Sequence, residues 1–187
     1  MARQFKRLVV GELALSSGGY ALHELVERYS TSSIMYERIT DSVKGSYCVC
    51  HGPGEKIYSD EESYEFIPDP SLLVGDVIIA DVAEGVLVTE IVDYGFENYI
   101  HMTSVVIPDS LIIIGSSAFS GCTSLERAVI SNSVTNIGSF VFSGCTSLKE
   151  IKFTGTEAQW NSISKASGWS TGCPSLSVIC TDGTIPI

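Results

Sequence analysis

Cys48, Cys50 and His51 are the residues whose types and spacing best suit chemistry, and they lie together in the stretch "YCVCHG". A thiol beside an imidazole could act as a nucleophile with its base, and two thiols with an imidazole could begin a metal site. Both patterns are incomplete. No group that would orient the base is recognisable, and C-x-C-H supplies at most three metal ligands with no second cysteine pair in range. A half-buried strand that ends in a turn is the favoured interpretation.

Three further cysteines, Cys122, Cys145 and Cys173, recur at equivalent places in the second half of the chain. Stacked disulfides and a ladder of metal ligands are two functional explanations for this recurrence. The favoured explanation is that each is a small buried side chain, because free cysteine is among the most buried residue types. Cys180 is expected in the core for the same reason. We therefore predict no cofactor and no metal site.

The distribution of charge indicates which kinds of binding partner are not expected. The net charge is −11, and residues 1–100 hold 7 basic and 17 acidic side chains. Phosphate binding needs clustered Lys and Arg, so nucleic acid is excluded as a partner. The acidic run around Asp60, Glu61, Glu62 and Glu65 lacks the alternating spacing of a calcium-binding EF-hand loop, and we interpret it as a solvated face.

Membrane insertion is not expected, because no apolar run approaches the roughly 18 residues of a membrane span. A signal peptide is not recognisable either. The apolar stretch near the N-terminus, "LVVGELALSS", is interrupted by Glu12 and lacks a convincing cleavage site.

The second half of the chain is built from a repeat. "FSGCTSL" occupies residues 119–125 and returns unchanged at residues 142–148, and the 23-residue blocks 102–124 and 125–147 agree at 12 positions. A third copy begins at Leu148, holds five extra residues with Trp160 and Trp169, and recovers at "GCPSL". Self-similarity at such a period is typical of a solenoid, in which stacked copies share one core.

Alternation within each copy predicts which residues face this core and which face solvent. The predicted repeat core comprises Ile107, Ile114, Phe119, Cys122, Leu125, Ile130, Ile137, Phe142, Cys145 and Leu148. The outward residues of the first short strand in each copy form a predicted binding surface of Ser104, Val106, Arg127, Val129, Glu150 and Lys152. Ile112 and Ile113 are apolar where the second copy is polar, which predicts a contact patch.

These blocks resemble the BspA-type leucine-rich repeat of bacterial surface proteins. The motif carried over is "IP-x-S-V-x-x-IG-x-x-AF-x-x-C-x-x-L", and the resemblance covers about residues 102–180 and nothing before residue 100. It implies a curved solenoid with a binding or adhesive role and no chemistry. The match departs from the motif where Pro108 becomes Ser131 in the second copy.

The first hundred residues are less regular. Residues 20–30, "YALHELVERYS", have apolar residues at helical spacing, whereas "SYCVCHG" and "EKIYS" read as strands around the turn "HGPG". Residues 60–70 read as an acidic connector, and residues 76–81 and 85–93 read as an apolar hairpin. The predicted fold is an α+β domain over residues 1–100, which anchors the chain and caps a short leucine-rich-repeat β-solenoid of about three coils over residues 101–187.

These features favour a non-enzymatic binding protein. We expect the N-terminal domain to dock on a larger assembly and the solenoid to recognise a protein partner or a cell-surface ligand, with a homo-oligomer as one form of the assembly. A phage virion component, of the fibre or decoration kind, is the leading hypothesis because no export signal is recognisable. A bacterial cell-surface or secreted adhesin is the alternative. A thiol-dependent enzyme using Cys48 or Cys50 ranks below both.

Overall fold

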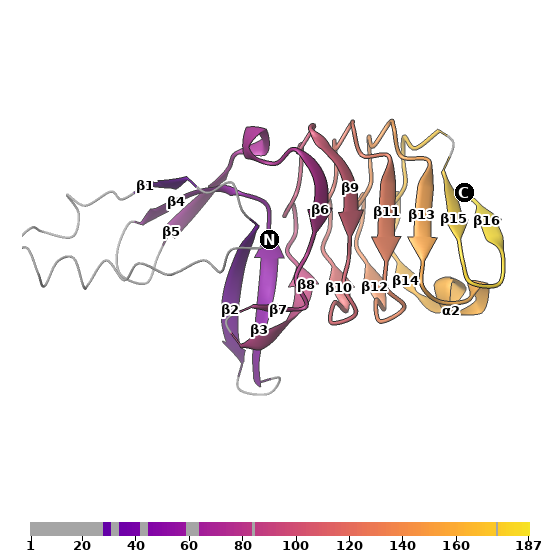
Figure 1. The fold of residues 1–187 in the computed structure, drawn as a ribbon, viewed down its shortest axis with the longest axis horizontal. Helices are drawn as coiled ribbons and strands as arrows, with labels where there is room; N and C mark the ends of the chain where they lie inside the picture. The colour runs from indigo at the N-terminus through magenta and orange to yellow at the C-terminus, as the bar shows by residue number, and fades with distance from the viewer. Residues whose placement is uncertain (1–27, 31–33, 42–44, 59–63, 84, 175) are drawn as a thin grey trace, which may run out of the picture.

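The computed structural model describes residues 28–30, 34–41, 45–58, 64–83, 85–174 and 176–187 (Figure 1). Its main body is a solenoid in which each turn of the chain adds one strand to each of two sheets. The first sheet contains, in spatial order, β6 (Gly75–Ile78), β9 (Met102–Val106), β11 (Arg127–Ile130), β13 (Glu150–Phe153), β15 (Ser177–Ile179) and β16 (Thr184–Pro186).

The second sheet runs along the other side of the solenoid. In spatial order it contains β2 (Met35–Asp41), β3 (Gly45–His51), β8 (Val86–Ile91), β10 (Ile113–Ile114), β12 (Asn136–Ile137) and β14 (Ser164–Lys165), and β7 (Val82–Ala83) pairs with β8. A third, antiparallel sheet at the N-terminal end is formed by β1 (Arg28–Ser30), β4 (Gly54–Tyr58) and β5 (Tyr64–Pro68). A short 3-10 helix, η2 (Pro70–Leu72), follows β5.

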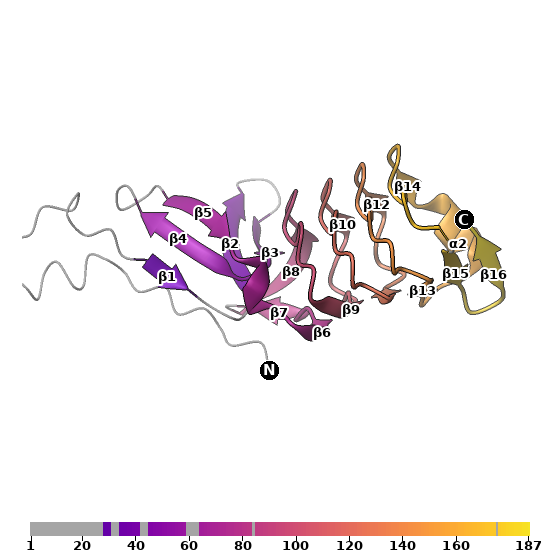
Figure 2. The ribbon, with the colours of Figure 1, turned by 90° about the horizontal axis from the view of Figure 1, so that it is seen from above.

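The parallel pairing has the register that the repeat predicts. Val105 lies opposite Ala128, and Ala128 opposite Ile151, so residues one repeat apart stack along the solenoid. The stacked turns are seen from above in Figure 2. The pairs β6/β8, β9/β10, β11/β12 and β13/β14 make about four turns, which is one more than predicted.

The extra turn comes from the segment that was predicted to be a hairpin, and that prediction is confirmed only next to its turn. There β7 pairs antiparallel with the start of β8, but β6 does not pair with β8. β6 pairs in parallel with β9 in the first sheet, and β8 pairs in parallel with β10 and β3 in the second. An apolar alternating run looks the same in a hairpin and in the two arms of a coil, because periodicity reports which face is buried and not which strand is the neighbour. Both sheets thus begin before residue 100, and the domain division there stays a prediction.

The N-terminal strands agree in part with the prediction. "SYCVCHG" and "EKIYS" are confirmed as the regions of β3 and β4, but "YEFIP", predicted to be a connector, is strand β5. The helix predicted over residues 20–30 and the acidic residues 60–62 lie outside the described residues, except that residues 28–30 form β1 and not a helix end. The α+β class of this region therefore stays a prediction.

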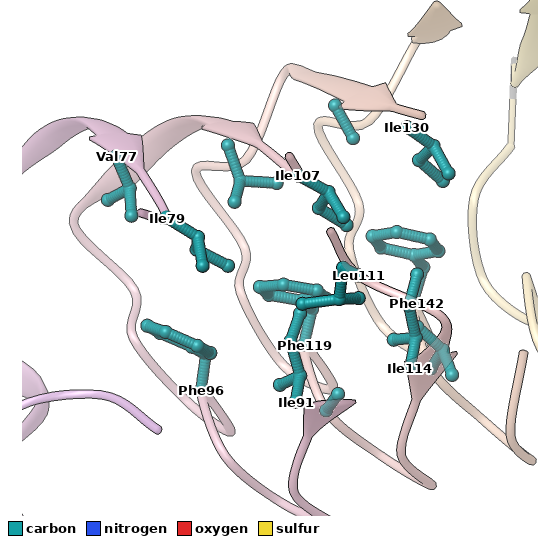
Figure 3. Packing of buried hydrophobic residues seen from close by; sticks show 14 of the residues in the cluster. Val77, Ile79, Ile91, Phe96, Ile107, Leu111, Ile114, Phe119, Ile130 and Phe142 are labelled. Atoms are coloured by element: carbon teal, nitrogen blue, oxygen red, sulfur yellow. The ribbon is translucent and has the colours of Figure 1, made fainter. Parts of the chain in front are cut away.

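A column of stacked phenylalanines runs through the core of the solenoid (Figure 3). The ring centroids of Phe96 and Phe119 are 5.3 Å apart, and those of Phe119 and Phe142 are 5.5 Å apart with the planes only 6° from parallel. All three rings are fully buried. Rings of this size dominate the apolar area removed from water, so the column is a main source of stability for the stacked turns.

Beside the rings runs a ladder of thiols. Cys122 Sγ donates to the backbone carbonyl of Phe96 at 3.0 Å, and Cys145 Sγ donates to that of Phe119 at 3.1 Å. Each of these two cysteines therefore packs in the core and also donates a hydrogen bond to a backbone carbonyl of the preceding turn. All six cysteines are free. The predicted core residues are all buried: Ile107, Ile114, Phe119, Cys122, Leu125, Ile130, Ile137, Phe142, Cys145 and Leu148.

In the first turn Tyr99 takes the place that cysteine holds in the later turns. Its ring is buried against Gly52, and its hydroxyl donates to the carbonyl of Pro53 in the turn between β3 and β4. The Gly52 amide also donates to the carbonyl of Gly95. These contacts join the N-terminal strands to the first turn of the solenoid.

The five extra residues of the third copy accommodate a short helix, α2 (Glu157–Ser162). It begins with a capping box, in which the side chains of Thr156 and Gln159 each bond the other's backbone amide. Trp160 on this helix is buried, with its ring 5.2 Å from that of Phe153 and 5.7 Å from that of Trp169. The tryptophan pair therefore packs at the C-terminal end of the core, where β16 closes the first sheet antiparallel to β15.

Candidate recognition surface

The six residues of the predicted binding surface lie in two rows across the first sheet, here called the strand strip. Their registers pair Ser104 with Arg127 and Arg127 with Glu150 in one row, and pair Val106 with Val129 and Val129 with Lys152 in the other. All six are at least partly exposed, whereas the residues that alternate with them are buried. The strip is therefore the solvent face of β9, β11 and β13.

The strip is longer than the sequence indicated. Asp76 and Ile78 of β6 extend its two rows at one end, and Ser177 and Ile179 of β15 extend them at the other. Ile78 is 68% exposed, which makes the second row mainly apolar over its length. Sequence reasoning missed β6 because its strand was assigned to a hairpin. The signal that could have found this turn lies in its other arm, where Ile91 and Phe96 precede Ile114 and Phe119 by one repeat length.

Hydrogen bonds order the charged end of the strip. Asp76 Oδ1 accepts from Ser104 Oγ at 2.6 Å and from Thr103 Oγ1 at 3.1 Å. These two hydrogen bonds lower the pKa of the Asp76 carboxyl, with a smaller contribution from the charge of Arg127. Arg127 lies 4.0 Å from Glu126, and both side chains are more than half exposed. An ion pair of this kind contributes little to stability, so Arg127 is available to a ligand.

The contact patch predicted at Ile112 and Ile113 forms one wall of a groove. The groove has a volume of about 430 Å³ and is lined by Tyr47, Thr89, Glu90, Ile112 and Ile113. Ile112 is 43% exposed. The residues come from β3, β8 and the first full repeat, so the groove crosses from the N-terminal strands onto the solenoid. What occupies it stays a prediction.

The thiols are poorly placed for catalysis. Cys48 and Cys50 are fully buried, and Cys48 Sγ donates to the carbonyl of Ala83 at 3.4 Å. Burial raises the pKa of the Cys50 thiol, and the neighbouring Cys48 raises it further. Burial likewise raises the pKa of Cys122 to about 12. Because the thiolate is the reactive form, protonated and buried thiols give the thiol-enzyme hypothesis no support.

Within the described part of the chain, no three His, Cys, Asp or Glu side chains are grouped so that they could hold a metal ion. The described helices also include none with the length and apolar character needed to cross a membrane.

Two exposed aromatic residues were not identified from the sequence. Tyr94 and Phe140 are 57% and 47% exposed, and both have a positive backbone φ, of 59° and 56°. They lie two repeats apart at the same position of their turns. The signal in the sequence was their separation of 46 residues, twice the repeat length.

Comparison with known proteins bears on the repeats. The family model of the BspA type leucine rich repeat region matches residues 86–177 in 6 copies, and so begins before the residue 100 that the sequence indicated. Comparison with functionally curated proteins gives no match.

Among solved structures, a leucine-rich repeat protein from Bacteroides capillosus has a TM-score of 0.52 at 21% identity, over 82% of this chain and 97% of that one. A leucine rich cell surface protein from Faecalibacterium prausnitzii has a TM-score of 0.46 at 24% identity, over 82% of this chain but only 42% of that one. The T. pallidum leucine rich repeat protein has a TM-score of 0.46 at 20% identity, over 76% and 67%. The likeness to the B. capillosus protein shows a shared fold.

Proposed function

Because residues 86–177 form a BspA-type leucine-rich repeat region, we propose that this chain is a non-enzymatic binding module of a bacterial cell-surface or secreted protein. The family, whose repeats are those of bacterial surface proteins, supports this reading over the virion hypothesis. A virion role stays a prediction without support from any of the comparisons. Docking of the N-terminal strands on a larger assembly also stays part of the proposal.

The strand strip is the proposed recognition surface. The observation that supports it most is the apolar row of Ile78, Val106 and Val129, which is at least partly exposed beside the charged side chain of Arg127. Flat sheet faces with an apolar centre and charged neighbours are suited to a protein surface or to an extended cell-surface ligand. No pocket or reactive group is required for this role.

Two experiments test the proposal. Antibody labelling of intact, unpermeabilised cells of the producing bacterium should detect the chain on the outside, or the chain should be found in the medium. Its presence in purified phage particles and absence from both fractions would favour the virion instead. In the second experiment, binding of the labelled full chain to intact epithelial and bacterial cells is measured by flow cytometry.

In that assay Val129→Lys and Arg127→Glu should each weaken binding by at least tenfold, because both lie at the centre of the strip. Thr135→Lys is the matched control, since Thr135 is exposed in the same repeat but lies away from the first sheet. Equal binding by the strip variants and by this control would exclude the strip as the recognition surface.

A further inference from the structure

Tyr94 and Phe140 occupy one position in alternate turns of the solenoid. The Tyr94 amide donates to the carbonyl of Ser116 at 2.9 Å, and the Ser117 amide donates to that of Ser139 at 2.8 Å, so this corner of each turn is bonded to the next. Ser117 lies between the two aromatic residues and has nearly the same φ, 54°. The corner thus carries Tyr, Ser and Phe in successive turns.

This position is a costly place for a large side chain. A left-handed backbone costs a non-glycine residue about 1–2 kcal/mol, and a bulky residue there is an outlier. The next turn has Gly168 at this corner, with φ 69°. Tyr94 and Phe140 are nevertheless about half exposed, although the Phe140 ring also lies against Gly168 of the next turn. The left-handed φ recurs in all four turns and so belongs to the repeat, and Tyr94 and Phe140 differ from the others only in their large side chains.

A hollow adjoins Tyr94. It has a volume of about 330 Å³ and is lined by Glu37, His51, Pro68, Val92, Asp93, Tyr94 and Gly95. Asp93 Oδ1 accepts from the Ser116 amide at 2.6 Å, which fixes the carboxylate, and Asp93 Oδ2 has no hydrogen-bond partner among the described residues. The hollow therefore places the Tyr94 ring and the second Asp93 oxygen as neighbours for one ligand.

The spacing and charge of these groups indicate the ligand. Two strand spacings separate the aromatic positions, which is about 10 Å. A linear β-1,4-linked glycan advances by roughly one strand spacing for each sugar, so the two side chains match sugars that are two apart. Aromatic faces pack on the C–H face of a sugar ring, and carboxylates accept hydrogen bonds from its hydroxyls. The net charge of −11 disfavours an anionic polysaccharide.

We propose that this corner binds a neutral β-1,4-linked glycan. Tyr94 and Phe140 each stack on one sugar, and the half-buried serine hydroxyls between them, including that of Ser117, contact the intervening sugar. The hollow at Asp93 receives a sugar at one end of the chain. This site is separate from the strand strip and rests on different residues, so either proposal can fail without the other.

The test uses the full chain and isothermal titration calorimetry with cellohexaose, xylohexaose and chitohexaose. These glycans share the backbone linkage but differ in the groups on the sugar, so they distinguish a cellulose, xylan or chitin source. At least one should bind. Tyr94→Ser and Phe140→Ser should each weaken that binding by at least tenfold, and the double variant should abolish it. Polygalacturonate, an anionic glycan, should not bind.

The substitutions are matched to the chain itself, because Ser117 shows that serine adopts this backbone conformation. Tyr94→Asn and Phe140→Asn are a second pair, supported by Asn98 with φ 61°. Leu87→Ser is the control, since Leu87 is 54% exposed and lies away from the corner. No binding to any of the three neutral glycans overturns the proposal. Unchanged glycan binding by the Tyr94 and Phe140 variants also overturns it.

Discussion

The close packing of turns at the glycine of each repeat leads to a sharp prediction for Gly138→Ala. A Cβ atom on Gly138 would lie 2.5 Å from the Ser116 nitrogen and 2.7 Å from its Cα. Both atoms belong to the backbone of the preceding turn, so no side-chain rotation can make room. The two turns would have to separate, which strains the hydrogen bond from the Gly138 amide to the Ile114 carbonyl at 2.9 Å.

The expected loss in the free energy of unfolding is about 3 kcal/mol, the upper end for overpacking, because backbone and not side-chain atoms must move. Gly144→Ala in the same repeat is the matched comparison. Gly144 has φ 73°, but its Cβ would meet nothing nearer than 3.8 Å. Its loss should be only about 1–2 kcal/mol, from the left-handed backbone alone. Gly144→Asn should lose less, since Asn98 adopts this conformation at the same position two turns earlier in the stack.

Guanidinium denaturation followed by tryptophan fluorescence measures these differences, because Trp160 and Trp169 both pack at the C-terminal end of the same core. The midpoint for Gly138→Ala should lie below that for Gly144→Ala with a similar dependence on denaturant. Equal midpoints, or a lower one for Gly144→Ala, would refute the argument that backbone contact between turns limits this position.

Three further predictions concern the cap, the thiols and the strip. Trp160→Ala should destabilise the chain by about 3–5 kcal/mol, because a fully buried ring is removed from the cap, and Trp160→Phe should lose much less in the same denaturation assay. With iodoacetamide at neutral pH, Cys173, which is half-buried, should react before Cys122 and Cys145, and mass spectrometry of the digested chain checks this order. The Asp76 carboxyl should titrate below its ordinary pKa of 3.8 by NMR, so its stabilising contribution is present above that pH and is lost as the pH falls through the lowered value. A midpoint at or above 3.8 would contradict the two hydroxyl hydrogen bonds.

Much of the solenoid was predictable from the sequence because the alignment of repeat copies gives the register of the stacked strands. Once "FSGCTSL" is aligned with its copy, the period of 23 residues determines which residues stack, and alternation determines which face inward. Phe119 and Phe142 stack as a consequence, with their ring centroids 5.5 Å apart. The outward rows of the strand strip follow from the same two facts.

Other features depend on contacts between segments that share no repeat. The pairing of β6 with β9 and of β8 with β3 depends on which strand edges come together in the fold. The apolar pattern of a strand does not indicate which strand pairs with it. Tyr99 replaces the cysteine of later turns because its hydroxyl reaches the carbonyl of Pro53, 46 residues earlier. The role of the Cys122 thiol as a donor to the preceding turn likewise needs the stacked backbone to be in place.

The sequence by itself determined the repeat, its period, its inward residues and the absence of a recognisable catalytic motif, because these are local patterns of residue type. Only the tertiary structure decided how many turns there are, how the N-terminal strands join them and that Tyr94 and Phe140 share one exposed corner. The physical reason is that these features are set by long-range backbone pairing and by dihedral angles. The pattern of apolar and polar residues determines neither of them.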